Sequence, residues 1–501
     1  RGPSASAGAA PMGHRGRVLL LAAFGLALST PSAAGGIVIE GRFDDWGPGD
    51  LRFESAGAGA QGGHDLPSAA ITRVWARADP RRIAVSFELR HETLLQRDSG
   101  IVLYLDLDGD AATGLPLEGM GADIRWSFGE KEGRAVVMGL PIRITQSGID
   151  LRQGPTLSAT RFELSVDRAV SIAGASFAPG DSAALLLRFE DREGRGERPG
   201  PGSSTGRLAF PLSDRALEVP EPAALSREDP GHLRLLTYNV LFDGCFERPE
   251  PFRRILRALD PEVLSLQEIY RHSLEETRAL VAGFLPGSSW HVAGSGQGPI
   301  LSRHPIRDSG PVGEAGRGSW ALIAAPGGDL LVINPHPPCC DDDAGRRREF
   351  DAIAAWLRDA GRSGRLRRGT PIVIAGDMNL VGESRQLATL LAGAISDTAV
   401  HGPSAAPDWD GTPLTDAMPY HLTGGEAYTW RGDDGPFAPG RLDYIVYSDS
   451  VLRLERSFVL WTPDLPQEYL DDAGLLREDT AVASDHLPVV ADFSFAPDSS
   501  R

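Results

Sequence analysis

An apolar run in the second half of the chain ends in an acid and an amide two residues apart. The run is Pro371-Ile-Val-Ile-Ala-Gly, and Asp377, Met378 and Asn379 follow it. A strand over the apolar residues would deliver both polar side chains into the glycine-led turn behind it. A carboxylate and a carboxamide in such a turn are typical of phosphate chemistry when other polar strand ends accompany them.

Five further polar landmarks accompany this turn, and apolar residues precede most of them. They are Thr237-Tyr-Asn239, Gln267-Glu268, His336 behind Leu331-Val-Ile-Asn, Asp443 in Arg441-Leu-Asp-Tyr-Ile, and Ser484-Asp485-His486. Six polar groups at the ends of expected strands predict one shared site. The ordered set indicates a catalytic function more strongly than any of its members, because each one alone could be a capped loop or a salt-bridged turn.

Taken in this order, the motifs resemble the endonuclease/exonuclease/phosphatase superfamily, whose members cleave phosphoester bonds with a divalent metal. The resemblance covers about Leu233 to Phe495. Gln297-Gly-Pro-Ile-Leu-Ser-Arg-His-Pro-Ile also matches the glycine-rich strand of that family. The resemblance implies the deoxyribonuclease I-like fold, a four-layer α/β (α+β) sandwich in which two mixed sheets face each other and helices cover both outer sides.

The resemblance also implies a role for the first landmarks. Glu268 would be the main ligand of a Mg²⁺ (or Mn²⁺) ion, and Asn239 and Asp485 would assist directly or through water. Asp377 would orient or deprotonate the attacking water, and Asn379 would donate a hydrogen bond to a non-bridging phosphate oxygen.

Two histidines complete the implied set. His486 would contact the phosphate or act as a base, with its ring held by Asp443. His336 would bind phosphate or act as a general acid toward the leaving group. The family leaves open whether Asp377 or His486 takes the proton. The glutamate that partners the second histidine in deoxyribonuclease-like members has no clear counterpart here, and Glu314 is the nearest suggestion.

The chain as a whole has the size and composition of a two-domain globular protein. It has 501 residues, 41% of them hydrophobic, and a formal net charge of −18. Chains of this length usually form more than one domain. The acidic balance disfavours a protein that holds nucleic acid by bulk electrostatics, although a nuclease with a local basic groove remains compatible with it.

The N-terminal segment is typical of a secretory signal peptide. Met12-Gly-His-Arg-Gly-Arg is followed by an apolar stretch from Val18 to Leu28, and Ser32-Ala-Ala34 offers small residues for cleavage. The apolar stretch is far shorter than the roughly 20 residues that span a bilayer. We therefore expect an upstream extension and signal peptide at 1–34, no transmembrane segment after its cleavage, and a secreted or periplasmic protein.

Residues 36–212 alternate short β-rich runs with glycine, proline and aspartate turns, which predicts an all-β sandwich. Ile39-Glu-Gly-Arg-Phe-Asp-Asp-Trp and Asp106-Leu-Asp-Gly-Asp-Ala-Ala-Thr-Gly resemble family 9 carbohydrate-binding modules. That resemblance implies a carbohydrate or cell-surface ligand. Trp46, Trp75 and Trp126 would either stack on sugars or fill the core, and the core is the commoner place for them.

Three carboxylates on one turn of this region, Asp106, Asp108 and Asp110, offer oxygen donors for a structural Ca²⁺. A solvated acidic turn is the alternative. An EF-hand is excluded, because the closing glutamate and the flanking helices are missing from the sequence.

A linker is expected at 213–231, followed by the phosphoesterase-like domain at 232–497. There, Phe252, Ile255, Leu256 and Leu259 recur at helical spacing, as one buried helix face would require. In the resembled fold the loop of Cys245 approaches that of Cys339 and Cys340. This implies a disulfide, with free thiols or a metal site as alternatives.

The sequence does not distinguish a nucleic-acid substrate from a lipid headgroup, because the implied catalytic set hardly differs among members of the family. Tyr428-Thr-Trp430 is a candidate stacking wall for a base or headgroup, with core packing as the alternative. A second class of function is a non-catalytic surface or glycan-binding protein with a degenerate hydrolase domain. Degeneration predicts gaps in the motif set, and every principal position here carries a competent residue.

Overall fold

The computed structural model describes residues 36–55, 71–97, 99–176, 180–190, 203–214, 221–294, 297–314 and 316–496. The expected signal peptide at 1–34 lies outside these residues, as do residues 215–220 of the expected linker. In the described ranges, no helix has the length and the apolar character that crossing a membrane requires. The domain limits expected from the sequence stay predictions.

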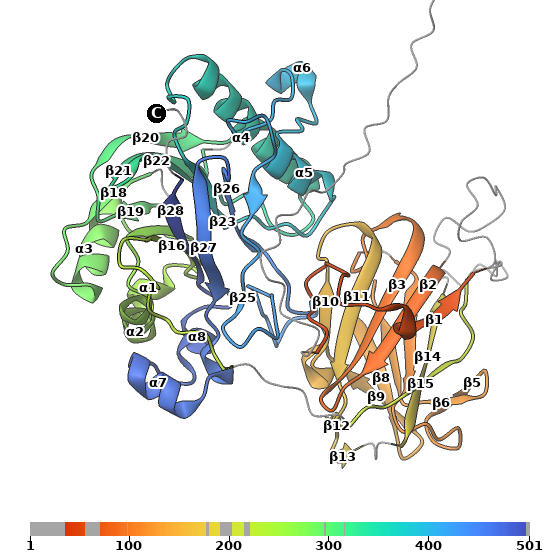
Figure 1. The fold of residues 1–501 in the computed structure, drawn as a ribbon. Coiled ribbons are helices and arrows are strands. Elements are labelled where there is room, and N and C mark those ends of the chain that lie inside the picture. Colours follow the sequence, from red (N-terminus) through yellow and green to blue (C-terminus); the bar gives the residue numbers. More distant parts are fainter. Residues whose placement is uncertain are drawn as a thin grey trace, which may run out of the picture.

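The first part of the chain is all-β and forms two antiparallel sheets (Figure 1). The first sheet has the order β1 (Leu51–Glu54), β2 (Ile71–Ala78), β3 (Arg82–Thr93), β11 (Ala159–Asp167), β10 (Arg152–Gly154). The second has the order β15 (Leu208–Pro211), β14 (Ser182–Phe189), β4 (Ile101–Asp106), β7 (Ile124–Ser127), β8 (Glu132–Val137), β9 (Leu140–Ile144). Two short ribbons pair β5 (Leu115–Leu117) with β6 (Met120–Ala122), and β12 (Ser171–Ile172) with β13 (Ala175–Ser176).

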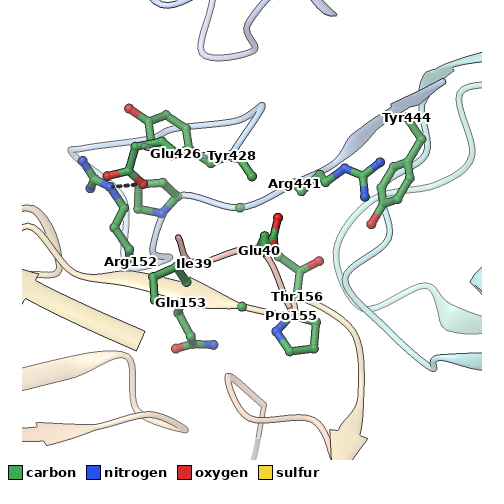
Figure 2. A pocket seen from close by; sticks show the side chains of 14 residues that line it. Ile39, Glu40, Arg152, Gln153, Pro155, Thr156, Glu426, Tyr428, Arg441 and Tyr444 are labelled. Atoms are coloured by element: carbon green, nitrogen blue, oxygen red, sulfur yellow. Dashed lines mark ion pairs between the residues drawn. The ribbon is translucent and has the colours of Figure 1, made fainter. Parts of the chain in front are cut away.

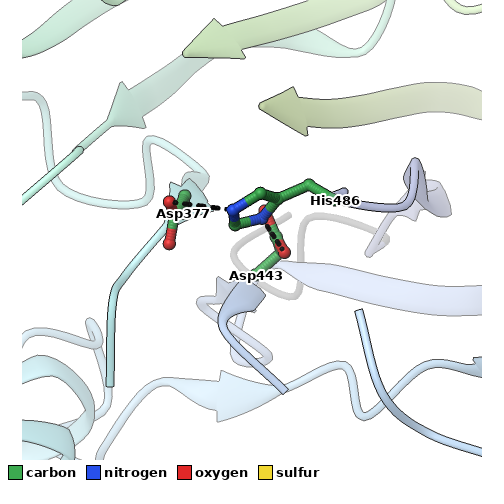
Figure 3. Close-up of side chains that lie close together, drawn as sticks. All are labelled: Asp377, Asp443 and His486. Carbon is green, nitrogen blue, oxygen red and sulfur yellow. Dashed lines mark hydrogen bonds and ion pairs between the residues drawn. The ribbon is translucent and has the colours of Figure 1, made fainter. Parts of the chain in front are cut away.

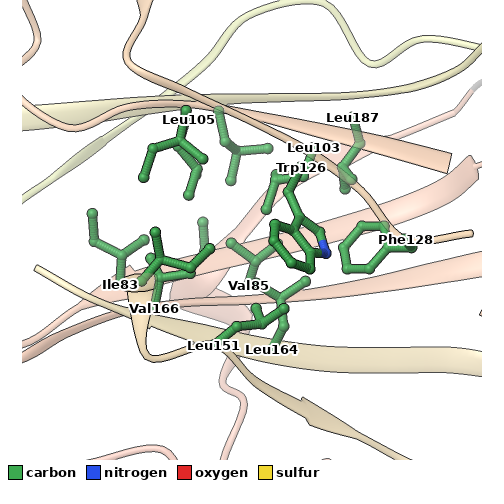
Figure 4. Close-up of a cluster of buried hydrophobic side chains, with 14 of the residues drawn as sticks. Ile83, Val85, Leu103, Leu105, Trp126, Phe128, Leu151, Leu164, Val166 and Leu187 are labelled. Carbon is green, nitrogen blue, oxygen red and sulfur yellow. The ribbon is translucent and has the colours of Figure 1, made fainter. Parts of the chain in front are cut away.

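One hydrophobic core joins these two sheets, as alternating strands of a sandwich require. Val85 and Leu164 from the first sheet meet Leu103 and Trp126 from the second (Figure 4). Trp126 is only 2% exposed, so this tryptophan belongs to the core rather than to a sugar-stacking surface. The expectation of an all-β N-terminal region is confirmed.

The second part of the chain contains two mixed sheets. One has the order β18 (His291–Ala293), β19 (Ile300–Ser302), β17 (Val263–Gln267), β16 (Leu233–Asn239), β28 (Val489–Phe495), β27 (Leu452–Val459), β25 (Tyr420–His421). The other has the order β20 (Ile306–Val312), β21 (Gly318–Ala325), β22 (Gly328–Asn334), β23 (Ile372–Asp377), β26 (Asp443–Tyr447), β24 (Thr415–Asp416). Both contain a parallel pair, β16 with β17 and β22 with β23, so both are mixed.

Helices cover the outer face of each sheet. The seven-stranded sheet is covered by α1 (Gly244–Glu247), α2 (Pro249–Leu259), α3 (Leu274–Phe284), α7 (Gln467–Ala473) and α8 (Asp479–Ala483). The six-stranded sheet is covered by α4 (Asp343–Arg362) and α5 (Arg385–Ala392), with α6 (Thr398–His401) beside α4.

Side chains alternate along the strands between these layers. Leu235 faces the core between the two sheets, whereas Leu236 faces the helices. The predicted helix face of Phe252, Ile255 and Leu256 is buried in the same helical layer. The layers therefore run helix, sheet, sheet, helix, and the expected four-layer α/β sandwich is confirmed.

The last strand of the chain lies in the middle of its sheet. β28 pairs with β16 on one side and with β27 on the other. A buried ion pair fastens this junction, because the guanidinium of Arg234 binds both carboxylate oxygens of Asp492 at 2.7 Å. The same guanidinium donates to the carbonyl oxygens of Leu225 and Leu259, so each of its three nitrogens has a hydrogen-bond partner.

The all-β and α/β parts share an interface in which each contributes to the core of the other. Leu157 belongs to the hydrophobic cluster under α4, and Ala438 belongs to the core of the sandwich. Thr156 donates its hydroxyl to the carbonyl oxygen of Leu380 at 2.7 Å. The backbone N–H of Ser158 donates to the carbonyl oxygen of Gly382 at 2.8 Å.

A second contact of this interface holds the loop before β26. Arg152 of the sandwich lies 3.5 Å from a carboxylate oxygen of Glu426, and its guanidinium lies 5.0 Å from the ring centre of Tyr428. These residues line a small pocket between the two parts, together with Arg441 and Tyr444 (Figure 2). The loop from Glu426 to Arg441 is therefore seated on the sandwich, and Tyr428 is buried rather than free to form a stacking wall.

Candidate active site

The predicted site residues meet at one edge of the two sheets. Asn239 and Asp377 end β16 and β23, Glu268 directly follows β17, and His336 is the second residue after β22. β26 runs antiparallel to β23, so its first residue, Asp443, is paired with Asp377. β28 likewise runs antiparallel to β16, and this brings His486, three residues before β28, to the same edge.

A buried histidine–carboxylate pair lies at the centre of this edge. Nδ1 of His486 lies 2.9 Å from Oδ2 of Asp443, which fixes the ring so that Nε2 faces Asp377 (Figure 3). That Nε2 lies 3.6 Å from Oδ2 of Asp377. Burial alone would lower the pKa of His486, but the carboxylates of Asp443 and Asp377 outweigh burial and raise it to about 10. The two carboxylates therefore favour the protonated form of the ring.

Several side chains of the site surround one carboxylate oxygen of Asp377. Its Oδ2 accepts hydrogen bonds from Nδ2 of Asn239 at 3.0 Å and from Nδ2 of Asn379 at 3.3 Å. Nε2 of His336 lies 3.5 Å from the same oxygen, which is slightly closer than Nε2 of His486. Four side-chain nitrogens thus surround one buried carboxylate oxygen.

The turn behind β23 is tightly built. The other oxygen of Asp377, Oδ1, accepts from the backbone N–H of Asn379, and Asn379 adopts a left-handed φ of 47° that asparagine tolerates. Gly376 is required by a close approach, because a Cβ there would lie 2.3 Å from the carbonyl oxygen of Pro335. The glycine therefore lets the loop of Pro335 and His336 lie directly against the end of β23.

Asn239 and Glu268 form the other side of the site. Nδ2 of Asn239 donates to Oε1 of Glu268 at 3.1 Å, and Oδ1 of Asn239 accepts from the N–H of Leu241. Asn239 thereby bridges the carboxylates of Glu268 and Asp377 and orients both. Its direct ligation of a metal stays a prediction.

The match to a protein-family model identifies the family to which the chain belongs. The model for the Endonuclease/Exonuclease/phosphatase family matches residues 236–486, which is half of the chain. The chain belongs to this family. All eight residues predicted for the site lie within the matched residues, and no curated protein matches the chain.

Several solved structures are similar to about half of this chain. Humanized TDP2 from D. rerio is 16% identical over 53% of this chain and 99% of that chain, with a TM-score of 0.35. The human Nocturnin catalytic domain with bound sulfate is 16% identical over 53% of this chain and 95% of that chain, with a TM-score of 0.33. ANGEL2, a 2′,3′-cyclic phosphatase in complex with adenosine-2′,3′-vanadate, is 18% identical over 53% of this chain and 97% of that chain, with a TM-score of 0.36.

The donor set of the site fits a hard divalent cation. Oδ2 of Asp485 accepts from the indole N–H of Trp430 at 3.0 Å, whereas its buried Oδ1 has no hydrogen-bond partner among the described residues. One oxygen of Asp443 is also buried without a partner in the described part of the chain. Buried carboxylate oxygens without donors are costly unless a cation meets them. Among the described residues, ligand atoms of Asp377, Asp443 and His486 lie within 4.8 Å of one another and could hold a cation. Carboxylate oxygens are ligands that Mg²⁺ and Mn²⁺ prefer.

Two further site residues escaped prediction from the sequence. Thr429 is fully buried, and its hydroxyl donates to Oδ2 of Asp443 at 2.7 Å. Trp430 binds Asp485, as described above. Both belong to the Tyr428-Thr-Trp segment that the sequence suggested as a stacking wall, and the structure corrects that interpretation. Thr429 could not be predicted, because a single threonine 14 residues before Asp443 forms no recognisable motif in the sequence.

Glu314 does not take the place of the missing glutamate. Its carboxylate forms an exposed ion pair with Arg348, in which Arg348 Nε lies 2.7 Å from the carboxylate. Nδ1 of His336 has no hydrogen-bond partner among the described residues, and Nε2 faces Asp377 and, at 3.9 Å, Glu268. His336 thus lies beside the carboxylates of Asp377 and Glu268, whereas Glu314 pairs with Arg348.

The three cysteines are unpaired in the structure. Cys245 is buried in the helical layer beside Phe252, while Cys339 and Cys340 are exposed on the loop after His336. The disulfide implied by the family resemblance is therefore absent.

A second acidic cluster lies in the sandwich. Carboxylate oxygens of Asp106, Asp108 and Asp123 lie within 4.8 Å of one another, and Asp110 is not part of this group. Asp110 instead caps its own turn by accepting from the N–H of Ala112. Burial, together with the charges of Asp108 and Asp106, raises the pKa of Asp123 to about 7. The buried Oδ2 of Asp106 has no partner among the described residues.

Proposed function

We propose that this chain is a divalent-metal-dependent phosphoester hydrolase that cleaves a phosphodiester by in-line attack of an activated water. The observation that carries the proposal is the convergence of His336 Nε2 and His486 Nε2 on Oδ2 of Asp377, at 3.5 and 3.6 Å. Phosphoester hydrolysis requires a base for water beside cationic and N–H donors for the phosphoryl oxygens. This arrangement supplies both within one buried cluster.

The protonation states favour a division of roles. His486, with its pKa raised to about 10, would act as a cationic ligand of the phosphate. Asp377 would then orient the water and accept its proton, while the Nδ2 group of Asn379 would turn from Asp377 to a phosphate oxygen. His336 would donate a proton to the leaving oxygen. Each well-placed acid or base contributes about 10²–10⁴-fold to the rate.

Glu268 and the free oxygen of Asp485 would hold the cation, with Asn239 orienting Glu268. A bound Mg²⁺ or Mn²⁺ would neutralise charge on the phosphoryl oxygens and stabilise the leaving oxygen.

We also propose that Asp106, Asp108 and Asp123 hold a structural Ca²⁺, because a cation would relieve the mutual repulsion of three clustered carboxylates.

The extracytoplasmic setting is a further proposal. A cleaved signal peptide at 1–34 would make the protein secreted or periplasmic. A carbohydrate or cell-surface ligand for the sandwich of 36–212 is proposed from the sequence resemblance. Of the three tryptophans considered for such a ligand, Trp46 and Trp126 are buried and Trp75 lies under the guanidinium of Arg161.

The test is turnover by the purified mature chain. Plasmid DNA, RNA, sphingomyelin, phosphoinositides and bis-p-nitrophenyl phosphate would be offered with Mg²⁺ or Mn²⁺ and again with EDTA. We expect cleavage that EDTA abolishes and that His486→Ala loses, while His291→Ala at an exposed histidine keeps it. Metal-independent turnover, or full activity of the folded His486→Ala variant, would contradict the proposal.

A further inference from the structure

Two exposed aromatic side chains stand together beside the candidate active site. Phe242 is 61% exposed and Tyr270 is 41% exposed, and their ring centres lie 5.5 Å apart with a tilt of 31°. Aromatic rings normally lose most of their surface on folding, because each buries a large apolar area. Among the described residues, Phe437 is the other exposed aromatic, and the ammonium of Lys131 covers its ring at 5.1 Å.

Both rings are tied to Glu268. The backbone N–H of Phe242 donates to Oε2 of Glu268 at 2.9 Å, and Tyr270 follows Glu268 by two residues. The phenol of Tyr270 is close enough to Glu268, Asp377 and Arg317 for their charges to act on it. The aromatic pair therefore borders the place where the phosphate would bind.

The backbone that presents Phe242 is unusual. Leu241, Phe242 and Asp243 have consecutive φ values of 50°, 50° and 63°, a left-handed run that residues with a Cβ rarely adopt. Such conformations persist only where the surroundings enforce them, and they gather at functional sites. Phe242 is exposed on this left-handed run, whereas Val240, two residues earlier, is buried in the helical layer.

A buried acid enforces the turn and joins it to the second ring. The Asp243 carboxylate has no exposed surface and accepts hydrogen bonds from the N–H groups of Tyr270 and Arg271. It also binds Nε of Arg271 and lies 3.0 Å from Nδ1 of His272. The loops that carry the two rings are thus fastened to each other, so the pair is pre-organised for a ligand.

We propose that Phe242 and Tyr270 form a stacking subsite for a nucleobase of single-stranded nucleic acid, adjoining the scissile phosphate. The proposal rests on the phosphodiesterase function proposed above. Stacking on aromatic side chains is tolerant of sequence, because every base has a π-face, and single-strand sites combine such rings with cations for the backbone. Arg317 is exposed and supplies a cation whose charge acts on the phenol of Tyr270.

A membrane is the competing occupant of this surface. The aromatic patch consists of two rings beside the ion pairs that Arg271 forms with Asp243 and Glu247. An interfacial anchor requires a larger apolar face and gains from positive charge near the headgroups. The aromatic patch is small and its neighbouring charges are ion-paired, so we favour a nucleobase over a membrane as its occupant.

The experiment measures binding without turnover. Fluorescence anisotropy in EDTA would compare the full mature chain bound to a labelled single-stranded oligothymidylate and to an abasic strand of equal length. We expect the base-bearing strand to bind tighter by about 5- to 150-fold for each stacked base. Phe242→Leu and Tyr270→Leu should remove this difference, and Phe242→Tyr, which keeps a ring on the same turn, should retain it.

The outcomes separate this proposal from the proposed function. Equal binding of the two strands by the wild-type chain, or base-dependent binding that survives in the folded Leu variants, would overturn the stacking subsite. Vesicles of phosphatidylglycerol that bind the wild type and not the Leu variants, without any base dependence, would assign the rings to a membrane instead. Hydrolysis of bis-p-nitrophenyl phosphate with Mg²⁺ is measured in parallel. Its absence would count against the hydrolase alone.

Discussion

Thr429 provides a sharp test of how the site is positioned. Its hydroxyl donates to Oδ2 of Asp443, the oxygen that also holds Nδ1 of His486. We predict that Thr429→Val lowers kcat and that Thr429→Ser does not, because serine keeps the hydroxyl while valine keeps the shape. A hydrogen bond to a charged partner contributes about 1.5–3 kcal/mol. If all of it acts in the transition state, the loss corresponds to about 10- to 150-fold in rate.

The same hydroxyl also accepts hydrogen bonds from the backbone N–H groups of Leu442 and Asp443. Valine would leave both N–H groups buried without an acceptor, at a cost of about 1–3 kcal/mol each. The kcat for bis-p-nitrophenyl phosphate should therefore be measured well below the unfolding temperature of each variant, with circular dichroism as the check of folding. A folded Thr429→Val enzyme with wild-type kcat would refute the argument. So would an equal loss of rate in the serine variant.

Three further predictions concern stability. Arg152→Met should lower the free energy of unfolding, because it removes the cation that lies 2.6 Å from Asp150 and 3.5 Å from Glu426, and Glu426→Gln in the same chain should restore part of the loss in urea titrations. Millimolar Ca²⁺ should raise the melting temperature of the wild type but not of Asp123→Asn, and an equal rise in both would exclude that site. Burial lowers the pKa of His421 to about 3, so the stability given by its neutral ring is complete above pH 6.5 and is lost as the pH falls toward 3. His421→Gln should flatten this acid limb, which unfolding measurements at pH 7 and pH 5 would reveal.

Much of the fold could be predicted because the sequence repeats simple periodicities. The apolar run before Asp377 is a buried strand, and the helical spacing from Phe252 to Leu259 is a buried helix face. The all-β character of the first part followed in the same way from short strands and frequent turns. These elements depend on local patterns, and local patterns are visible in a sequence.

Contacts between distant segments were the part that the sequence could not supply. Asp123 joins Asp106 through the pairing of β4 with β7, so the acidic cluster differs from the run of three carboxylates read along one turn. Thr429 reaches Asp443 only because the loop before β26 folds back over the strand end. Phe242 is exposed by a left-handed turn, and nothing in its sequence neighbours marks that backbone conformation.

The position of β28 in the middle of its sheet has a consequence for folding. This strand separates β16 from β27 and follows Asp485 and His486 by only a few residues. Until β28 pairs with β16, the sheet stays open and Arg234 lacks the carboxylate of Asp492. Pairing between segments so distant in the sequence closes slowly. We therefore expect the candidate site to be assembled only when β28 has joined its sheet, late in folding.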